Sequence, residues 1–120
     1  MSLVNDQHKF LQDAAKLIIH AGEQGFKVTA GELFRSPEQQ AIYVKTGRSK
    51  TQNSLHLNRL AIDINVFKNG KLCGKEEMKE LGAFWESLDP LNSWGGNGKK
   101  LLDCPHFSRG NGKPEWARAT

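Results

Sequence analysis

Residues 54–67 of the chain read SLHLNRLAIDINVF, and we expect this stretch to decide the fold. From Leu60 to Val66 an aliphatic side chain stands at every second position. Such alternation is typical of a β-strand that places one face on a core. Asp63 would then lie on the opposite face, in a site whose base is formed by the sheet.

His56 lies seven positions before Asp63. In one straight strand the two side chains would face opposite sides and lie roughly 20 Å apart, at about 3.3 Å per residue. They can share a metal ion only if the chain bends between them, and we expect this bend at Asn58 and Arg59. Without it, the stretch is an ordinary amphipathic strand with an exposed aspartate.

The composition fits one domain with a modest core. The chain has 120 residues, of which 38% are hydrophobic and 25% charged, and this length suits a single domain. We expect residues 1–120 to form that domain, with a loosely packed C-terminal tail over about 108–120. The net charge of +4 favours acidic partners such as nucleic acid, an anionic wall polymer or a membrane surface, without choosing among them.

The cysteines and the N-terminus indicate a chain folded in the cytoplasm. Cys73 and Cys104 form no CxxC pair, and we expect both to be reduced. The first residues lack a basic stretch followed by an apolar one, so no signal peptide is visible. The longest apolar patch, around residues 17–19, is too short to span a bilayer, and we predict no membrane insertion.

Local patterns predict further elements on both sides of the central strand. Apolar side chains at helical spacing predict helices over residues 7–21 and 75–88. Ser36 followed by Pro37 has the form of a helix start, so a shorter helix should run to about Val44. The sequence also predicts a strand over residues 26–30 and a hairpin turn at Asn69-Gly70, returning through Cys73.

A second polar cluster, Asp103-Cys104-Pro105-His106, lies far downstream. Pro105 disfavours a helix, so Asp103 and His106 should sit on an extended or turning segment. Histidine, aspartate and a distant histidine form a ligand set that zinc accepts while keeping one position open. If His106 binds zinc, Asp103 is near enough to take a proton from water whose pKa zinc lowers toward about 7. Cys104 is the alternative ligand.

Three other features have both a structural and a functional interpretation. Arg35, just before the cap, is either a surface cation or a positioned electrophile. Trp94, in the glycine-rich stretch 92–98, belongs either to the core or to the wall of a substrate groove. Residues 45–53 carry three cations and form either a solvated loop or a substrate-facing rim.

Together these motifs resemble the M15 family of zinc peptidases. The family includes D-alanyl-D-alanine carboxypeptidases, dipeptidases and the L-alanyl-D-glutamate endopeptidases of phage endolysins. Each motif alone would be weak, but they run in the family's order over most of the chain. The matching residues are Arg35-Ser36-Pro37-Glu38-x-Gln40, Ser54-x-His56-x(4)-Ala61-x-Asp63, Trp94-Gly95-Gly96 and Asp103-x-x-His106-Phe107.

The resemblance implies roles for several of the matching residues. His56, Asp63 and His106 would bind zinc. Asp103 would be the general base and would also protonate the leaving amine. Arg35 would polarise the scissile carbonyl and stabilise its oxyanion. Substrate would be bound by Ser54, Gln40 and Trp94.

The resemblance also implies a fold and a function. The fold would be a small α+β domain, an antiparallel sheet flanked by helices. The chain would be a zinc-dependent peptidoglycan hydrolase that cuts stem peptides, most directly an L-alanyl-D-glutamate endopeptidase of phage or prophage endolysin type. We expect it to be made in the cytoplasm, to reach the wall after release, to act as a monomer and to bind no nucleic acid.

Three alternatives remain open from the sequence. Within the enzyme class, the chain could be a D-alanyl-D-alanine carboxypeptidase or dipeptidase. Outside it, the chain could be a non-catalytic wall-binding module or, on its net charge alone, a nucleic-acid binder. Two departures from the family bear on the site: many relatives have glycine in place of Arg59, and many have glutamate in place of Asp103.

Overall fold

The computed structural model describes residues 2–47, 58–98 and 103–110. The predicted substrate-binding residue Ser54 and the predicted zinc ligand His56 lie outside these ranges. In chain order the elements are α1 (Leu3–Glu23), β1 (Lys27–Ala30), α2 (Pro37–Lys45), β2 (Ala61–Lys68), β3 (Lys71–Leu72), α3 (Lys75–Leu88), β4 (Asn92–Trp94), the 3₁₀ turn η2 (Gly95–Asn97) and β5 (His106–Arg109).

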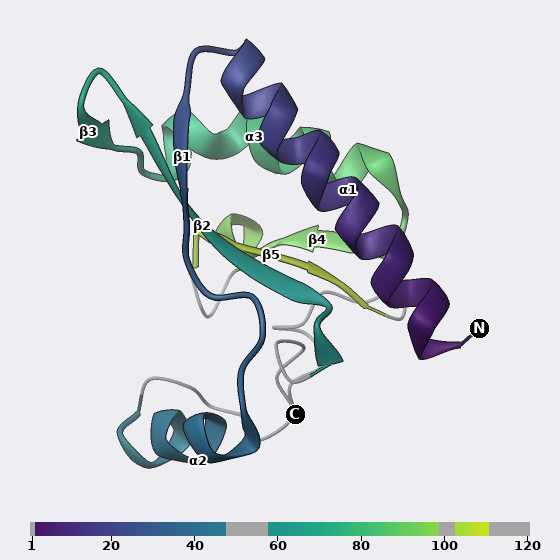
Figure 1. Cartoon of the computed structure of the whole chain (residues 1–120). Helices are drawn as coiled ribbons and strands as arrows, with labels where there is room; N and C mark the ends of the chain where they lie inside the picture. The colour runs from purple at the N-terminus through teal and green to yellow at the C-terminus, as the bar shows by residue number, and fades with distance from the viewer. Residues whose placement is uncertain (1, 48–57, 99–102, 111–120) are drawn as a thin grey trace.

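The strand predicted at the centre of the sequence, β2, is also central in the sheet (Figure 1). The strand order is β1-β2-β5-β4, and the short β3 also pairs with β2. Each pairing within the described residues is antiparallel. The predicted α+β fold with an antiparallel sheet is therefore confirmed.

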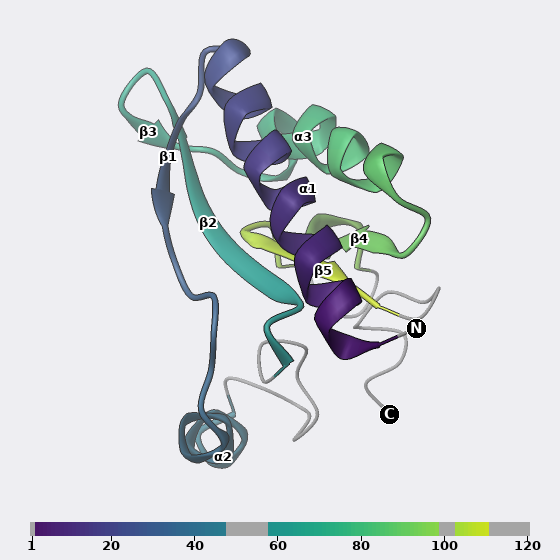
Figure 2. The ribbon, with the colours of Figure 1, turned by 45° about the vertical axis from the view of Figure 1, so that its right-hand side comes forward.

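Two of the helices pack on the sheet and one lies apart. Figure 1 and Figure 2 both show α1 and α3 together beside the sheet, with α2 at the far end of the segment that follows β1. Phe10 of α1 and Phe107 of β5 each meet Trp85 of α3 edge-to-face, at centroid distances of 5.7 Å and 6.0 Å. All three rings are buried, and buried aromatic contacts of this kind contribute strongly to stability.

The alternation predicted for β2 determines which side chains enter this core. Leu60, Ile64 and Val66 are buried, and Ile62 packs against the same cluster. Ala61 alternates with these residues and by the same pattern would face the other side with Asp63, yet it too is fully buried. The second face is therefore covered at the start of the strand.

The predicted bend before β2 is confirmed at Arg59. Its φ of 58° lies in the left-handed region, which few residues other than glycine adopt. Gln7 Nε2 donates to the carbonyl of Asn58 at 2.9 Å, which ties the bend to α1. The Arg59 guanidinium lies over the Phe34 ring, 4.2 Å from its centroid. The Arg59 side chain thus gains a partner at the bend.

The first helix is longer than the apolar pattern indicated. It begins at Leu3 rather than at residue 7, because Ser2 caps it and its Oγ accepts a hydrogen bond from the Asn5 amide at 3.2 Å. Ile18 is one of the apolar side chains at helical spacing in this stretch, but it is 39% exposed. Among the described residues, no helix is long and apolar enough to cross a membrane.

Three local predictions are confirmed by the geometry. The Ser36 side chain caps α2, with its Oγ 3.1 Å from the Gln39 amide. Asn69 and Gly70 both have positive φ, 53° and 77°, as the hairpin between β2 and β3 requires. The third helix, α3, has the predicted bounds.

The predicted loose tail begins too early at residue 108. Ser108 and Arg109 belong to β5 and are 1% and 3% exposed. The amide of Arg109 donates to the carbonyl of Leu60 at 2.8 Å, so sheet pairing continues to this point. Residues 111–120 lie outside the described ranges.

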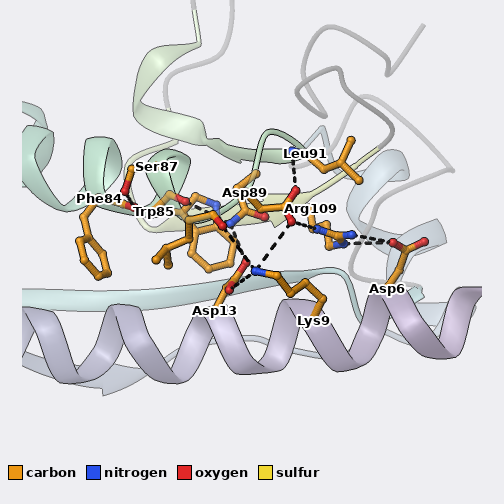
Figure 3. Close-up of polar contacts among 11 residues, drawn as sticks. Asp6, Lys9, Asp13, Phe84, Trp85, Ser87, Asp89, Leu91 and Arg109 are labelled. Carbon is orange, nitrogen blue, oxygen red and sulfur yellow. Dashed lines mark hydrogen bonds and ion pairs between the residues drawn. The ribbon is translucent and has the colours of Figure 1, made fainter. Parts of the chain in front are cut away.

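A partly buried ionic cluster, which we call the α1 anchor, joins the first helix to the rest of the domain (Figure 3). Arg109 pairs with Asp6 of α1 and with Asp89 at the end of α3, each at 3.0 Å. Lys9 pairs with the fully buried Asp13 at 2.6 Å and lies 3.7 Å from Asp89. Each of these three carboxylates therefore faces a basic side chain.

Candidate active site

Asp63 and His106 meet directly across the central pair of strands. They are register partners in β2 and β5, so both side chains point to the same face of the sheet. Ile62 and Phe107, the next partners along, belong to the core that α1 and α3 cover. Asp63 and His106 therefore face away from these two helices.

The separation of the two side chains suits a shared cation. His106 Nδ1 and Asp63 Oδ1 lie 3.1 Å apart. Two ligands of one tetrahedral zinc ion, each about 2.0–2.1 Å from the metal, lie roughly 3.3 Å from each other. The imidazole is 10% exposed and the carboxylate 27%, so both are shielded from water but reachable.

Asp103 joins this pair from the turn that leads into β5. The ligand atoms of Asp63, Asp103 and His106 all lie within 4.8 Å of one another. The turn is held by its backbone: the His106 amide donates to the Asp103 carbonyl at 3.1 Å, and the Ile64 amide donates to the Pro105 carbonyl at 3.0 Å. The predicted turning segment is thus confirmed, and it brings the acid to the two facing residues.

Gly95 allows this turn to pass close to the end of β4. Its carbonyl accepts a hydrogen bond from the Asp103 amide at 3.0 Å. A Cβ at this position would lie 2.2 Å from the Asp103 carbonyl oxygen, far inside any normal contact. The glycine-rich stretch therefore serves the site by admitting neighbouring backbone.

The donor set fits a divalent metal ion. Two carboxylates and an imidazole are ligands that zinc accepts, and other divalent ions accept them too. Within the described residues, the group able to hold an ion consists of Asp63, Asp103 and His106. The third predicted ligand, His56, lies outside those residues and remains a prediction.

The loop between β1 and α2 is hydrogen-bonded to the backbone of Asp63. The Gly31 amide donates to the Asp63 carbonyl at 2.9 Å, and the Asp63 amide donates to the Glu32 carbonyl at 2.7 Å. A Cβ on Gly31 would lie 2.6 Å from the Asp63 carbonyl oxygen. This close approach fixes the loop that carries Arg35 against a candidate metal ligand.

Arg35 is held by a set of polar side chains rather than being a solvated cation. Its Nε donates to Glu32 Oε1 at 2.5 Å, and its Nη2 pairs with the same oxygen. Its Nη1 donates to Gln40 Oε1 at 2.7 Å. The guanidinium also lies over the Tyr43 ring, 4.7 Å from the centroid. The interpretation of Arg35 as a solvated surface cation is therefore wrong.

The two other predicted substrate residues among the described ranges are buried. Gln40 is 1% exposed and contacts Arg35. Trp94 is 1% exposed, and its Nε1 donates to the Cys104 carbonyl at 2.8 Å. Trp94 therefore supports the turn next to the site from within the core, and a direct substrate contact by either residue stays a prediction.

Both cysteines are free thiols. Burial is the largest influence on the Cys104 thiol, and the nearby Asp103 carboxylate adds to it, so the pKa of this thiol lies above its ordinary value. Within the described residues, the group able to hold an ion does not include the Cys104 Sγ, which disfavours Cys104 as the alternative ligand. Its backbone carbonyl instead accepts the bond from Trp94.

Sequence reasoning missed the residues that position Arg35. Glu32 and Tyr43 carry no motif, and Gly31 looks like an ordinary loop glycine. The one available signal was an acid three positions before Arg35 at the corner into a helix. That signal is weak, because the contact depends on how the loop folds back.

The fold and the site together form a small α+β domain with a candidate metal site on one face of its sheet. A family profile described as D-alanyl-D-alanine carboxypeptidase matches residues 47–109, which is more than half of the chain. The chain belongs to this family, the M15 peptidases.

Two individual relatives support the assignment. The chain is 34% identical to an L-alanyl-D-glutamate peptidase of Listeria phage A118 over 99 residues, or 78% of this chain. It spans only 34% of that relative's length. It also matches the crystal structure of the L-Ala D-Glu endopeptidase ChiX of Serratia marcescens, with a TM-score of 0.67 and 25% identity. That match covers 82% of this chain and 79% of the other.

Proposed function

We propose that the chain is a zinc-dependent peptidoglycan peptidase that cuts stem peptides at the L-alanyl-D-glutamate bond. The observation that carries this proposal is the convergence of Asp63, Asp103 and His106 on one face of the sheet. Both relatives described above are named for this bond. The phage relative further favours a role as a phage or prophage endolysin.

Zinc would be held by Asp63 and His106, with His56 as the third ligand. When bound, such an ion polarises a carbonyl oxygen and makes water acidic enough to attack near neutral pH. Asp103 then takes the proton from the attacking water and passes it to the leaving amine, which is general base followed by general acid catalysis. The Asp103 carboxylate lies within 4.8 Å of the ligand atoms of Asp63 and His106, so it is close enough to exchange a proton with water at the site.

Arg35 would stabilise the negative charge that develops on the scissile carbonyl oxygen. A pre-positioned cation is effective in this role because it need not reorganise during the reaction. Ser54, Gln40 and Trp94 would complete the substrate site, with Gln40 acting at least through its contact to Arg35. The net charge of +4 would help a monomeric enzyme to reach the acidic wall after release from the cytoplasm.

The peptide bond that the chain cuts is identified by digesting purified sacculi and analysing the new N-termini and the released amino acids. The proposal expects new N-terminal D-glutamate, and expects Asp103→Asn to abolish it while the protein stays folded. Release of free D-alanine without new D-glutamate ends would contradict it. That result would instead support the carboxypeptidase named by the family profile.

A non-catalytic wall-binding module is distinguished by separating binding from cleavage. The proposal expects His106→Ala to stop the release of peptides while leaving sedimentation with sacculi largely intact. If the wild-type chain sediments with sacculi but releases nothing in the presence of zinc, the binding-module alternative replaces the enzyme.

A further inference from the structure

Glu32 is connected to both halves of the candidate site. Its backbone carbonyl accepts the hydrogen bond from the amide of Asp63 at 2.7 Å. Its carboxylate accepts the bond from Arg35 Nε at 2.5 Å. One residue thus links the backbone of a candidate metal ligand to the side chain of the proposed electrophile.

The two oxygens of the Glu32 carboxylate have separate partners. Oε1 faces Nε and Nη2 of Arg35, while Oε2 accepts a hydrogen bond from the Tyr43 hydroxyl at 3.2 Å. Gln40 Oε1 accepts from the third guanidinium nitrogen, Nη1. The buried Gln40 and the Tyr43 ring both come from α2. The Glu32 carboxylate on one side and two side chains of α2 on the other therefore all contact the guanidinium.

We propose that Glu32 is a positioning residue that sets Arg35 relative to the metal site. This inference rests on the proposed function, because it assigns Glu32 a role through the catalytic role of Arg35. An arginine side chain has considerable rotamer entropy, and holding it in advance spares that cost during the reaction. A catalytic group misplaced by about 1 Å can lose roughly 100-fold in rate.

The main test compares Glu32→Gln with Glu38→Gln, an exposed glutamate in the first turn of α2 that serves as the matched control. Glu32→Gln keeps the shape of the side chain but removes the charge that aligns the guanidinium. We expect kcat on a soluble stem peptide to fall about 10- to 100-fold, with KM and zinc content close to wild type. Glu38→Gln should change none of these values.

A double-mutant cycle tests whether Glu32 acts through Arg35. In an Arg35→Ala background, adding Glu32→Gln should lower kcat by less than about twofold, because the group it orients is already gone. If the kcat of the double mutant falls by the product of the two single-mutant factors, the proposal is overturned. Tyr43→Phe, which removes only the donor to Oε2 and keeps the ring, should lower kcat by a smaller factor than Glu32→Gln.

A third readout is independent of catalysis. In the ¹⁵N spectrum, the Nε–H signal of Arg35 is assigned by its loss in Arg35→Lys. It should exchange slowly with water in the wild type and in Glu38→Gln, and fast in Glu32→Gln. If the signal behaves in this way but wild type cleaves no stem peptide, the positioning role stands and the proposed function fails. If the signal is equally protected in Glu32→Gln, the positioning role fails, whatever the activity.

Discussion

The two ends of strand β5 hold ionisable side chains in opposite ways. At its start, His106 meets Asp63, and Asp103 lies within the same 4.8 Å group. At its end, Arg109 is 4% exposed and forms ion pairs with Asp6 and Asp89. The first end gathers acids around an imidazole, while the second places each acid against a base.

This difference separates a binding site from a structural contact. Carboxylates that are matched by bases within the protein hold elements together and have little need of a ligand. Two carboxylates that converge with an imidazole favour a bound cation, since cations satisfy such a group of donors. The alternation of β5 sends His106 to one face of the sheet and Arg109 to the other.

The largest expected effect comes from breaking the first end with His106→Ala. Removing a ligand should weaken zinc affinity by at least about 100-fold, beyond the roughly 10- to 100-fold loss typical of an outer partner. Wall cleavage should fall with it, while the metal-free protein keeps nearly its wild-type stability. Calorimetric zinc titration and urea unfolding measure the two quantities. Equal zinc affinity in the variant would contradict the site.

Breaking the second end with Arg109→Met should reverse this pattern. Asp6 loses its cation and Asp89 keeps only Lys9, at 3.7 Å, and removing one partner of a buried pair costs about 3–5 kcal/mol. Because Asp6 and Asp89 are 19% and 16% exposed, we expect about 2–3 kcal/mol in the free energy of unfolding. Zinc affinity, measured on the folded variant, should stay within about twofold. A loss of zinc affinity larger than that of stability would show that the two ends are coupled.

Gly31→Ala tests the metal site through the loop that is hydrogen-bonded to the backbone of Asp63. The added methyl group would lie 2.6 Å from the Asp63 carbonyl oxygen, so we expect a cost of about 1–3 kcal/mol together with weaker zinc binding. Gly22→Ala is the matched control, since a Cβ added there would meet nothing within 4 Å apart from its chain neighbours and the backbone of its own helix. That helical change should raise stability by about 0.5–1 kcal/mol and leave zinc binding unchanged.

The smallest expected effect is a pH dependence of the α1 anchor. Burial raises the pKa of Asp89, but hydrogen bonds from the Leu91 amide and from Arg109 outweigh it, so this pKa lies below its ordinary value. The ionised form therefore stabilises the fold above the ordinary pKa of 3.8, and this stability is lost as pH falls through the lower folded-state pKa. Asp89→Asn in metal-free protein should differ from wild type at pH 7 and converge with it in acid. A constant difference at all pH values would contradict the pairing.

Local patterns predicted much of the fold because their causes lie within a few residues. The Ser36 cap, the Asn69-Gly70 turn and the apolar stripe of α3 each depend on near neighbours, and each is confirmed. The alternation around Asp63 also placed its side chain on the correct face. These features depend on residue propensities and on the periodicity of apolar side chains, both of which can be seen in a single sequence.

Contacts between distant segments could not be predicted in this way. The burial of Asp13 depends on Lys9 and on Asn92, whose amide donates to it at 3.1 Å from the far side of the core. The meeting of Asp63 with His106 was expected from the family motif, but its distance depends on the register of β2 with β5. The hydrogen bond from the Asp63 amide to the Glu32 carbonyl depends on how the loop after β1 lies against β2.

The central claim is that the start of β5 belongs to a metal site and its end does not. The most direct measurement is the zinc content of purified wild type, His106→Ala and Arg109→Met, paired with wall cleavage before and after chelation. The account predicts about one zinc per chain in wild type and Arg109→Met, little in His106→Ala, and cleavage that chelation abolishes and added zinc restores. Wild-type protein that takes up no zinc, or His106→Ala that retains it fully, would contradict the account.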